Sequence, residues 1–160
     1  RLHIIRPSDT VSANAGRLKH RQRSKQTETE KMDQARYDLG MKLRREVMGD
    51  AHVDRSLAAA DEMTKPLVDL VTEIGWGGTW GRPGLPKRDR SLINIGMLTA
   101  LNRPDELRGH LRGALNNGVT REEIVEVILQ TAIYCGMPAA LDSMRHAKAV
   151  FAAADEEAAG

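Results

Sequence analysis

A base, an acid and a cation recur along one side of a helix predicted after residue 103. Arg103, Glu106 and His110 follow at i, i+3 and i+7, and at about 100° per residue these positions share one side of the helix. An imidazole beside a carboxylate can transfer a proton, and a guanidinium can hold an anion. The trio therefore marks a candidate reaction site. The spacing alone favours the alternative of a polar helix border with an internal ion pair, because such trios are common at helix surfaces.

Two helices and a tight turn position these three residues. Pro104 suits the first position of a helix, and Asn117-Gly118 ends that helix because glycine readily takes the left-handed conformation that closes it. Thr120 and Glu123 then form a capping box for a second helix. This second helix is apolar around most of its circumference, so we expect it to be buried on most sides.

The rest of the chain predicts further helices and contains no convincing strand. Apolar positions at helical spacing, with local start and stop signals, predict five more helices: over residues 34–48, from 50, from 64, from 86 and over 139–154. Aromatic residues make up only 3% of the chain, which favours helix packing over a sheet sandwich. We expect an all-α domain of about seven helices over residues 32–154, followed by a frayed acidic tail at 155–160. Its helices are more apolar than a monomer of this size can cover, which predicts a homo-oligomer.

Residues 75–86 interrupt the helical pattern with five glycines and two prolines, and they contain both tryptophans of the chain. We expect a loop here. Trp76 and Trp80 either pin this loop to the core or form a wall over a pocket, with Arg82 directed at an anionic ligand. Arg90 lies near the start of the next helix, just before a buried run. An acidic partner is favoured over an anionic ligand for its charge.

Charge is distributed unevenly along the chain. Residues 1–31 contain eight Lys/Arg and three Asp/Glu, whereas the remainder contains sixteen basic and nineteen acidic residues. The basic overall balance therefore comes from the N-terminal segment and is no argument for a nucleic-acid partner. We expect residues 1–31 to be a flexible basic extension; the alternative is an arm that grips a neighbouring subunit or an anion.

Cysteine content and hydropathy limit the cellular compartments in which the protein is expected. Cys135 is the only cysteine, so the chain has neither an internal disulfide nor a CxxC redox pair, and its place at the end of an apolar helix predicts a buried, inert thiol. No apolar run reaches about 18 residues, and no signal-peptide pattern is present at the N-terminus. The sequence therefore predicts a cytoplasmic protein with no membrane partner.

Five segments, in order along the chain, resemble the carboxymuconolactone decarboxylase family. They are VMGDAHVD at 47–54, the 76–85 loop with its RPGL, RSL at 90–92, HLRGA with NG at 110–118, and YCGMPAA at 134–140. The resemblance covers residues 34–151. It implies an all-α fold shared with the alkylhydroperoxidase AhpD-like proteins, and assembly as a homo-oligomer, commonly a trimer or hexamer.

The resemblance also implies a reaction, the removal of CO2 from 4-carboxymuconolactone to give the 3-oxoadipate enol-lactone. The conjugated lactone carbonyl can accept the electrons left by CO2, so no cofactor and no metal is expected. The substrate, a small carboxylated lactone, is a dianion. Arg82, with Arg90 or Arg103, is suited to hold it.

Proton transfer and stabilisation of the lactone oxygen are assigned to residues of the two helices after residue 103 and of the segment 75–86. His110 is the candidate to return a proton to carbon, and Glu106 could set its tautomer. A donor such as the Trp80 N–H or the Tyr134 O–H could stabilise charge on the lactone oxygen, with Trp76 as a further wall of the substrate site.

Two departures from related patterns limit this reading. In the peroxidase branch of the superfamily the pattern resembles CxxC followed four residues later by His. If His110 matches that His, Arg103 and Glu106 occupy the two Cys positions, which argues against disulfide-based peroxide reduction. The protocatechuate-pathway enzymes usually have Asn after Pro-Ala-Ala, where this chain has Leu141. Two alternatives stay open: another small-molecule enzyme on the same scaffold, and a non-catalytic helical oligomer that binds a ligand or protein.

Overall fold

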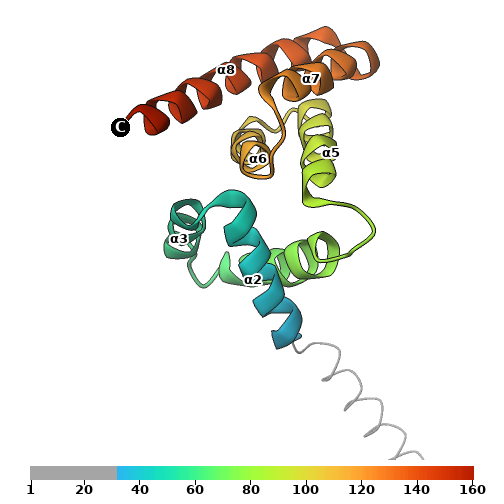
Figure 1. Ribbon diagram of the computed structural model, residues 1–160. Coiled ribbons are helices and arrows are strands. Elements are labelled where there is room, and N and C mark those ends of the chain that lie inside the picture. Colours follow the sequence, from blue (N-terminus) through green and yellow to red (C-terminus); the bar gives the residue numbers. More distant parts are fainter. Residues whose placement is uncertain (1–31) are drawn as a thin grey trace, which may run out of the picture. The chain divides into compact units, whose positions relative to one another are not determined.

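The computed structural model describes residues 32–160, and this part of the chain is built from helices without a strand (Figure 1). Its elements are α2 (Gln34–Met48), α3 (Asp50–Ala58), α4 (Lys65–Leu70), the π-helix η1 (Val71–Trp80), α5 (Lys87–Ala100), α6 (Pro104–Asn116), α7 (Arg121–Cys135) and α8 (Met137–Ala159). The predicted all-α class is therefore confirmed. Residues 34–160 form one compact unit. The basic extension expected at 1–31 lies outside the described residues.

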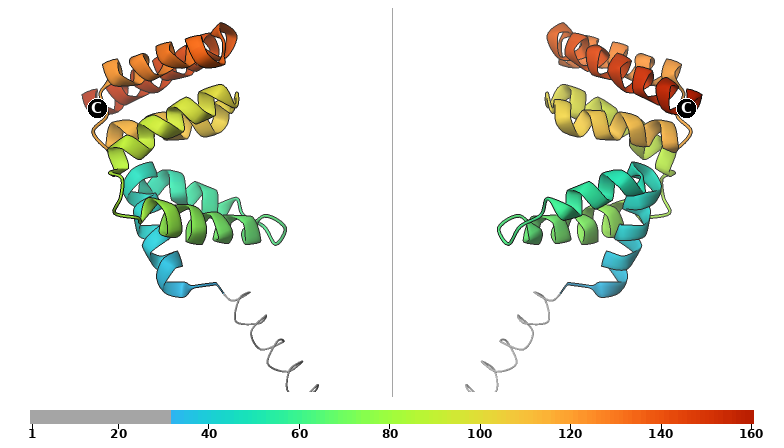
Figure 2. Two further views of the ribbon diagram at one scale, coloured as in Figure 1. Left: turned by 90° about the vertical axis from the view of Figure 1, so that its right-hand side faces the viewer. Right: turned by 90° about the vertical axis from the view of Figure 1, so that its left-hand side faces the viewer.

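The four C-terminal helices enclose the main hydrophobic core. α7 and α8 lie side by side, α5 and α6 form a second pair, and the two pairs stack on each other (Figure 2). Apolar side chains from these helices fill the space between the pairs, led by Ile95, Leu107, Leu111, Ile124 and Ile128, each at most 1% exposed. α6, which carries Glu106 and His110, is thereby fixed against α5 and α8 on one side.

On its other side α6 contacts α2, and α2 in turn packs along η1. Gly40 and Gly77 allow this close packing of α2 on η1: a Cβ on Gly40 would lie 1.9 Å from the Thr72 carbonyl oxygen, and one on Gly77 would lie 2.1 Å from the Arg36 carbonyl oxygen. The loop predicted from residue 75 is therefore wrong as far as Trp80. The glycines there allow two backbones to meet and do not form turns, and only residues 81–86 leave the helix.

The local signals around the α6–α7 turn are confirmed. The Thr120 hydroxyl accepts from the Glu123 N–H at 3.2 Å, and the Glu123 carboxylate accepts from the Thr120 N–H at 2.9 Å, which completes the capping box. Gly118 has φ of 81°, the left-handed conformation expected of it. These contacts join α6 to α7 and hold the start of α7 in place.

The last helix differs from the prediction at both ends. α8 begins at Met137 and continues to Ala159, so the end expected at Ala154 and the frayed tail after it are wrong. Asp155 pairs with Arg121 of α7 at 2.5 Å, and Glu157 pairs with Arg112 of α6. These ion pairs tie the acidic end of the helix to elements that precede it in the chain.

The expected burial of α7 on most sides is also wrong. Ile133 and Tyr134 are 78% and 80% exposed, and the Cys135 thiol is exposed instead of buried. Periodicity identifies an apolar face without stating whether the same chain covers it. Within residues 32–160, no helix combines the length and the hydropathy needed to cross a membrane.

Candidate active site

A cavity of about 380 Å³ lies where α6 faces α2, α3 and η1. It falls in the range of roughly 300–1,000 Å³ that is usual for small-molecule sites. The side chains and backbone that line it are Arg44, Met48, His52, Val71, Trp76, Asp105, Glu106, Gly109 and His110. Of the residues predicted from sequence, His110, Glu106 and Trp76 are thus brought together.

Two tryptophan rings flank His110. The Trp76 and Trp80 ring centroids each lie 6.3 Å from the His110 ring centroid, and the two indoles stack on each other at 4.8 Å. Trp76 is buried, whereas Trp80 is partly exposed. The two rings project from η1, so the π-helix, and not the predicted loop, supplies the aromatic wall. Of the two, Trp76 lines the cavity together with His110.

The surroundings of His110 favour its neutral form in the free protein. Burial lowers the pKa of His110 below its ordinary value, the nearby His52 lowers it further, and Glu106 acts in the opposite direction. The Asn94 amide nitrogen lies 3.4 Å from His110 Nδ1. This long contact orients the ring from α5. Among the described residues Asn94, and not Glu106, makes the contact with His110 Nδ1.

A buried arginine that the sequence analysis did not single out lines the same cavity. Arg44 is 9% exposed, and its guanidinium donates to the Ser56 hydroxyl at 2.7 Å and to the Thr72 hydroxyl at 3.3 Å. Within residues 32–160 no carboxylate pairs with it. Burial lowers the pKa of Arg44, yet a guanidinium stays charged at neutral pH. A signal for it was present: Gly40, Arg44 and Val47 share the buried face of α2 at helical spacing.

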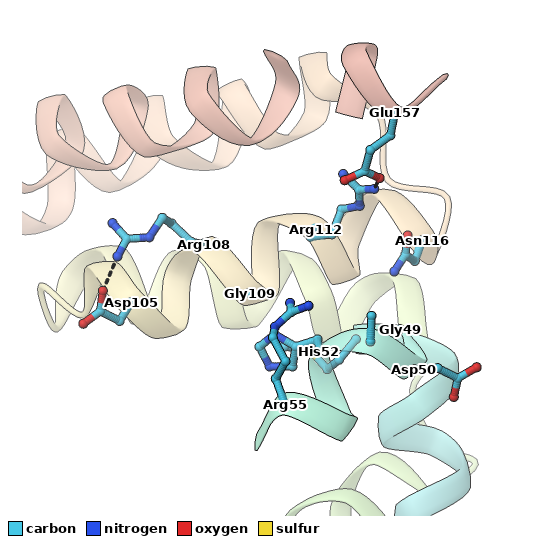
Figure 3. A pocket seen from close by; sticks show the side chains of 12 residues that line it. Gly49, Asp50, His52, Arg55, Asp105, Arg108, Gly109, Arg112, Asn116 and Glu157 are labelled. Carbon is cyan, nitrogen blue, oxygen red and sulfur yellow. Dashed lines mark hydrogen bonds and ion pairs between the residues drawn. The ribbon is translucent and has the colours of Figure 1, made fainter. Parts of the chain in front are cut away.

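A second cavity of about 580 Å³ adjoins the first and shares Met48, His52, Asp105 and Gly109 with it. Figure 3 shows His52 and Arg55 on α3 beneath Gly109 of α6. The same view shows Asp105 joined to Arg108 on α6. His52, expected to be a structural or interface residue, thus lies between the two cavities. Burial lowers its pKa, and so do Arg44 and Arg55.

The predicted cationic residues do not line the His110 cavity. Arg82 and Arg103 are exposed. The Arg90 guanidinium donates to the carbonyl oxygens of Leu85 and Arg82, at 3.2 Å and 3.1 Å, and thereby fixes the loop before α5. The acidic partner expected for Arg90 is thus replaced by backbone carbonyls.

Tyr134 lies elsewhere. It lines a separate, apolar groove of about 400 Å³ between α5 and α7, together with Ile93 and Met97. Within one chain the Tyr134 hydroxyl therefore does not belong to the His110 cavity.

The cavity combines the groups that a decarboxylation requires. It holds a buried cation for a carboxylate, an imidazole that can exchange a proton, the carboxyl group of Glu106 and the aromatic ring of Trp76. An apolar surrounding also favours loss of CO2, because it disfavours the compact charge of a carboxylate relative to a delocalised anion.

Comparisons with known proteins agree with this chemistry. The model of the carboxymuconolactone decarboxylase family matches residues 66–149. The chain is 44% identical over 119 residues to a 4-carboxymuconolactone decarboxylase of Acinetobacter baylyi, covering 74% of this chain and 89% of that protein. It is 43% identical over 108 residues to a nitrosuccinic acid decarboxylase of Metarhizium robertsii, covering 68% of this chain and 76% of that protein.

Proposed function

Because the chain belongs to the carboxymuconolactone decarboxylase family, we propose that it removes CO2 from 4-carboxymuconolactone, or a closely related carboxylated lactone, without a cofactor. The observation that carries this proposal is the cavity in which His110 lies with Glu106, Arg44 and Trp76. The name of the Acinetobacter relative suggests the substrate. The residues that line the cavity have the charges and the proton-transfer group that this substrate requires.

The reaction needs an electron sink, which the substrate itself contains. The bond between the ring carbon and its carboxylate breaks, CO2 leaves, and the electron pair moves through the ring double bond onto the lactone oxygen. The carbon next to the lactone carbonyl then takes a proton, which gives the enol-lactone. The protein has to hold the dianion, stabilise the oxygen and supply that proton.

In this proposal His110 supplies the proton. The substrate is a dianion, and a bound carboxylate beside the imidazole raises the pKa that burial lowers in the free protein. Substrate binding would therefore favour the protonated form of His110, which is the proton donor. Glu106 supports the charged ring, and the indole N–H of Trp80 is a candidate donor to the lactone oxygen.

This role predicts two different pH profiles. The value of kcat/KM reports the free protein, so it should fall about tenfold per pH unit above the lowered pKa of His110, whereas kcat should persist to higher pH because the bound substrate raises that pKa. The protonated form is the active one, so activity is lost as pH rises. Initial rates from about pH 5.5 to about pH 9 measure both profiles. A kcat/KM that rises with pH over this range would assign the neutral imidazole to the reaction instead.

Arg82, Arg90, Arg103 and Tyr134 keep only their predicted roles toward the substrate. Each lies away from the cavity in its own chain, so these roles would require a neighbouring subunit or a movement of the 81–86 loop. The buried guanidinium in the cavity is the stronger candidate for an anion.

The function is tested by incubating the purified full chain with 4-carboxymuconolactone and measuring released CO2 and the enol-lactone product. Nitrosuccinate serves as the comparison substrate, because the Metarhizium relative is named for it. We expect turnover of the lactone. A folded chain that leaves the lactone unchanged would contradict the proposal, and turnover of nitrosuccinate in its place would transfer the assignment to that acid.

We also propose that the chain self-associates, as a trimer or hexamer. The support is the apolar surface of α5, α7 and α8, which a single chain leaves uncovered. Its exposed members are Ile93, Met97, Leu101, Leu129, Ile133, Tyr134, Met137 and Leu141. Exposed apolar residues gathered on neighbouring helices are typical of an interface between proteins, and Ile93, Met97 and Tyr134 share one groove.

A charge placed on this surface should separate the subunits. Ile133→Glu is expected to shift the full chain to a smaller species in light scattering, because an unpaired carboxylate is costly to bury. Met63→Glu is the matched control, since Met63 is 83% exposed and lies outside the surface of α5, α7 and α8. An unchanged mass for Ile133→Glu would remove this surface from the interface.

For the compartment we propose the cytoplasm. The exposed thiol of Cys135 supports this, because a free surface cysteine persists in a reducing environment.

A further inference from the structure

We propose that Arg44, which Ser56 and Thr72 hold in the lining of the His110 cavity, is the anchor for a carboxylate of the substrate. This inference rests on the proposed function for the identity of the substrate. The site itself rests on the burial and the contacts of Arg44. It names the residue that binds the charged group, a role that the sequence analysis gave to other arginines.

No carboxylate of residues 32–160 pairs with Arg44. Arg44 is 9% exposed as a residue, and a charge on so buried a side chain is usually paired with an opposite one. Both of its observed acceptors, Ser56 and Thr72, are neutral hydroxyls. Folding alone gains little from such a charge, so its retention on the buried face of α2 points to a ligand.

The Arg44 guanidinium is held in a fixed position. Ser56 comes from α3 and Thr72 from η1, so the guanidinium is held from two elements while it lines the cavity. Arginine has five N–H donors, and these two contacts use two of them. The remaining donors can meet a carboxylate in the paired geometry that arginine favours. A fixed guanidinium also loses little conformational entropy when it binds.

The other charged residues of the cavity leave Arg44 without a counter-charge from residues 32–160. Asp105 is paired with Arg108 and Glu106 is exposed, so neither carboxylate neutralises Arg44. On the neighbouring wall, burial lowers the pKa of His52, and the charges of Arg44 and Arg55 lower it further, so two cations lie near this part of the cavity. A carboxylate on Arg44 would lie near these cations, in the same cavity as His110.

The test measures binding apart from turnover. Trp76 and Trp80 are the only tryptophans of the chain, so its indole fluorescence reports on the aromatic wall of the site. Maleate, a non-reactive dicarboxylate, is the probe, and the neutral maleamide is its uncharged counterpart. We expect a saturable fluorescence change with maleate alone. Arg44→Met should weaken maleate binding at least tenfold, and Lys42→Met, on the exposed side of α2, should leave it unchanged.

Thermal unfolding separates an anchor from a structural clamp. Removing an unpaired buried charge should leave the melting temperature of Arg44→Met equal to that of the wild type or above it, whereas loss of a clamp between α2, α3 and η1 would lower it. If Arg44→Met does not fold, Arg44→Lys decides, since it keeps the charge without the fork of donors. Weaker maleate binding is then expected.

Three results would overturn the inference: no saturable response of the wild type to maleate, equal binding of maleamide, or unchanged maleate affinity in the folded Arg44 variants. The proposed function fails differently. Maleate binding that depends on Arg44, with no turnover of 4-carboxymuconolactone, would keep the anchor and discard the reaction. Turnover whose KM does not rise in Arg44→Met or Arg44→Lys would keep the reaction and discard the anchor.

Discussion

Replacing His110 with alanine is expected to lower kcat for 4-carboxymuconolactone by about 10²- to 10⁴-fold, the usual contribution of a positioned acid or base. The imidazole is the group of the cavity best able to exchange a proton, and the rings of Trp76 and Trp80 lie beside it. In the variant, a water molecule without a fixed position would have to supply the proton. KM should change far less than kcat, because Arg44 would still bind a carboxylate of the substrate.

His146→Ala is the matched control for this variant. His146 lies on α8, where it pairs with Asp142 at 3.4 Å, and it does not line the His110 cavity. Circular dichroism and thermal unfolding of both variants confirm that each is folded. Full activity of a folded His110→Ala protein would remove His110 from the mechanism, and an equal loss in His146→Ala would show that the effect is indirect.

Gly40→Ala is expected to destabilise the protein by about 3 kcal/mol or more, the upper range for overpacking. The added Cβ would lie 1.9 Å from the Thr72 carbonyl oxygen and 2.8 Å from the Gly77 backbone nitrogen. Both obstacles are backbone atoms, so no side-chain rotation relieves the clash, and α2 has to move away from η1. Denaturant unfolding measures the change in the free energy of unfolding.

Gly75→Ala provides the comparison within η1. Its Cβ would meet only the Val71 side chain, at the ordinary distance of 3.8 Å. Alanine is favoured over glycine in a helix by about 1 kcal/mol, so this variant should be as stable as the wild type or more so. A Gly40→Ala protein with wild-type stability would show that α2 and η1 do not pack this closely.

Much of the fold could be predicted because its signals are local. The α2 helix over 34–48, the capping box of Thr120 and Glu123, and the turn at Gly118 depend on residues that are neighbours in the chain. Such contacts can be read from spacing alone. The resemblance to the decarboxylase family was confirmed for the same reason, since it depends on short segments in a fixed order.

The errors arose where a pattern had two physical meanings. A glycine can form a turn, and it can also allow two helices to pack closely. Gly77 of η1 allows close packing against α2. An apolar face serves a core and also an exposed surface, as at Ile133. The end of α8 depends on partners far away in the sequence, namely Arg112 and Arg121.

The candidate site was predicted in part. His110, Glu106 and Trp76 line one cavity, whereas the cations chosen for it lie elsewhere. Arg82, Arg90 and Arg103 were predicted to bind the substrate because they lie near glycines or helix starts, where the sequence pattern changes. Arg44 lies within an ordinary helical stretch, and its importance comes from burial without a carboxylate, which only the packing of α2 on α3 and η1 reveals.

A crystal structure of the full chain with a saturated, dicarboxylated lactone would show where the substrate binds. This analogue lacks the ring double bond that accepts the electrons, so it should bind without losing CO2. We predict its lactone ring against Trp76, within hydrogen-bond distance of His110, and one carboxylate on Arg44. An analogue bound in the groove beside Tyr134, with the His110 cavity empty, would contradict the account.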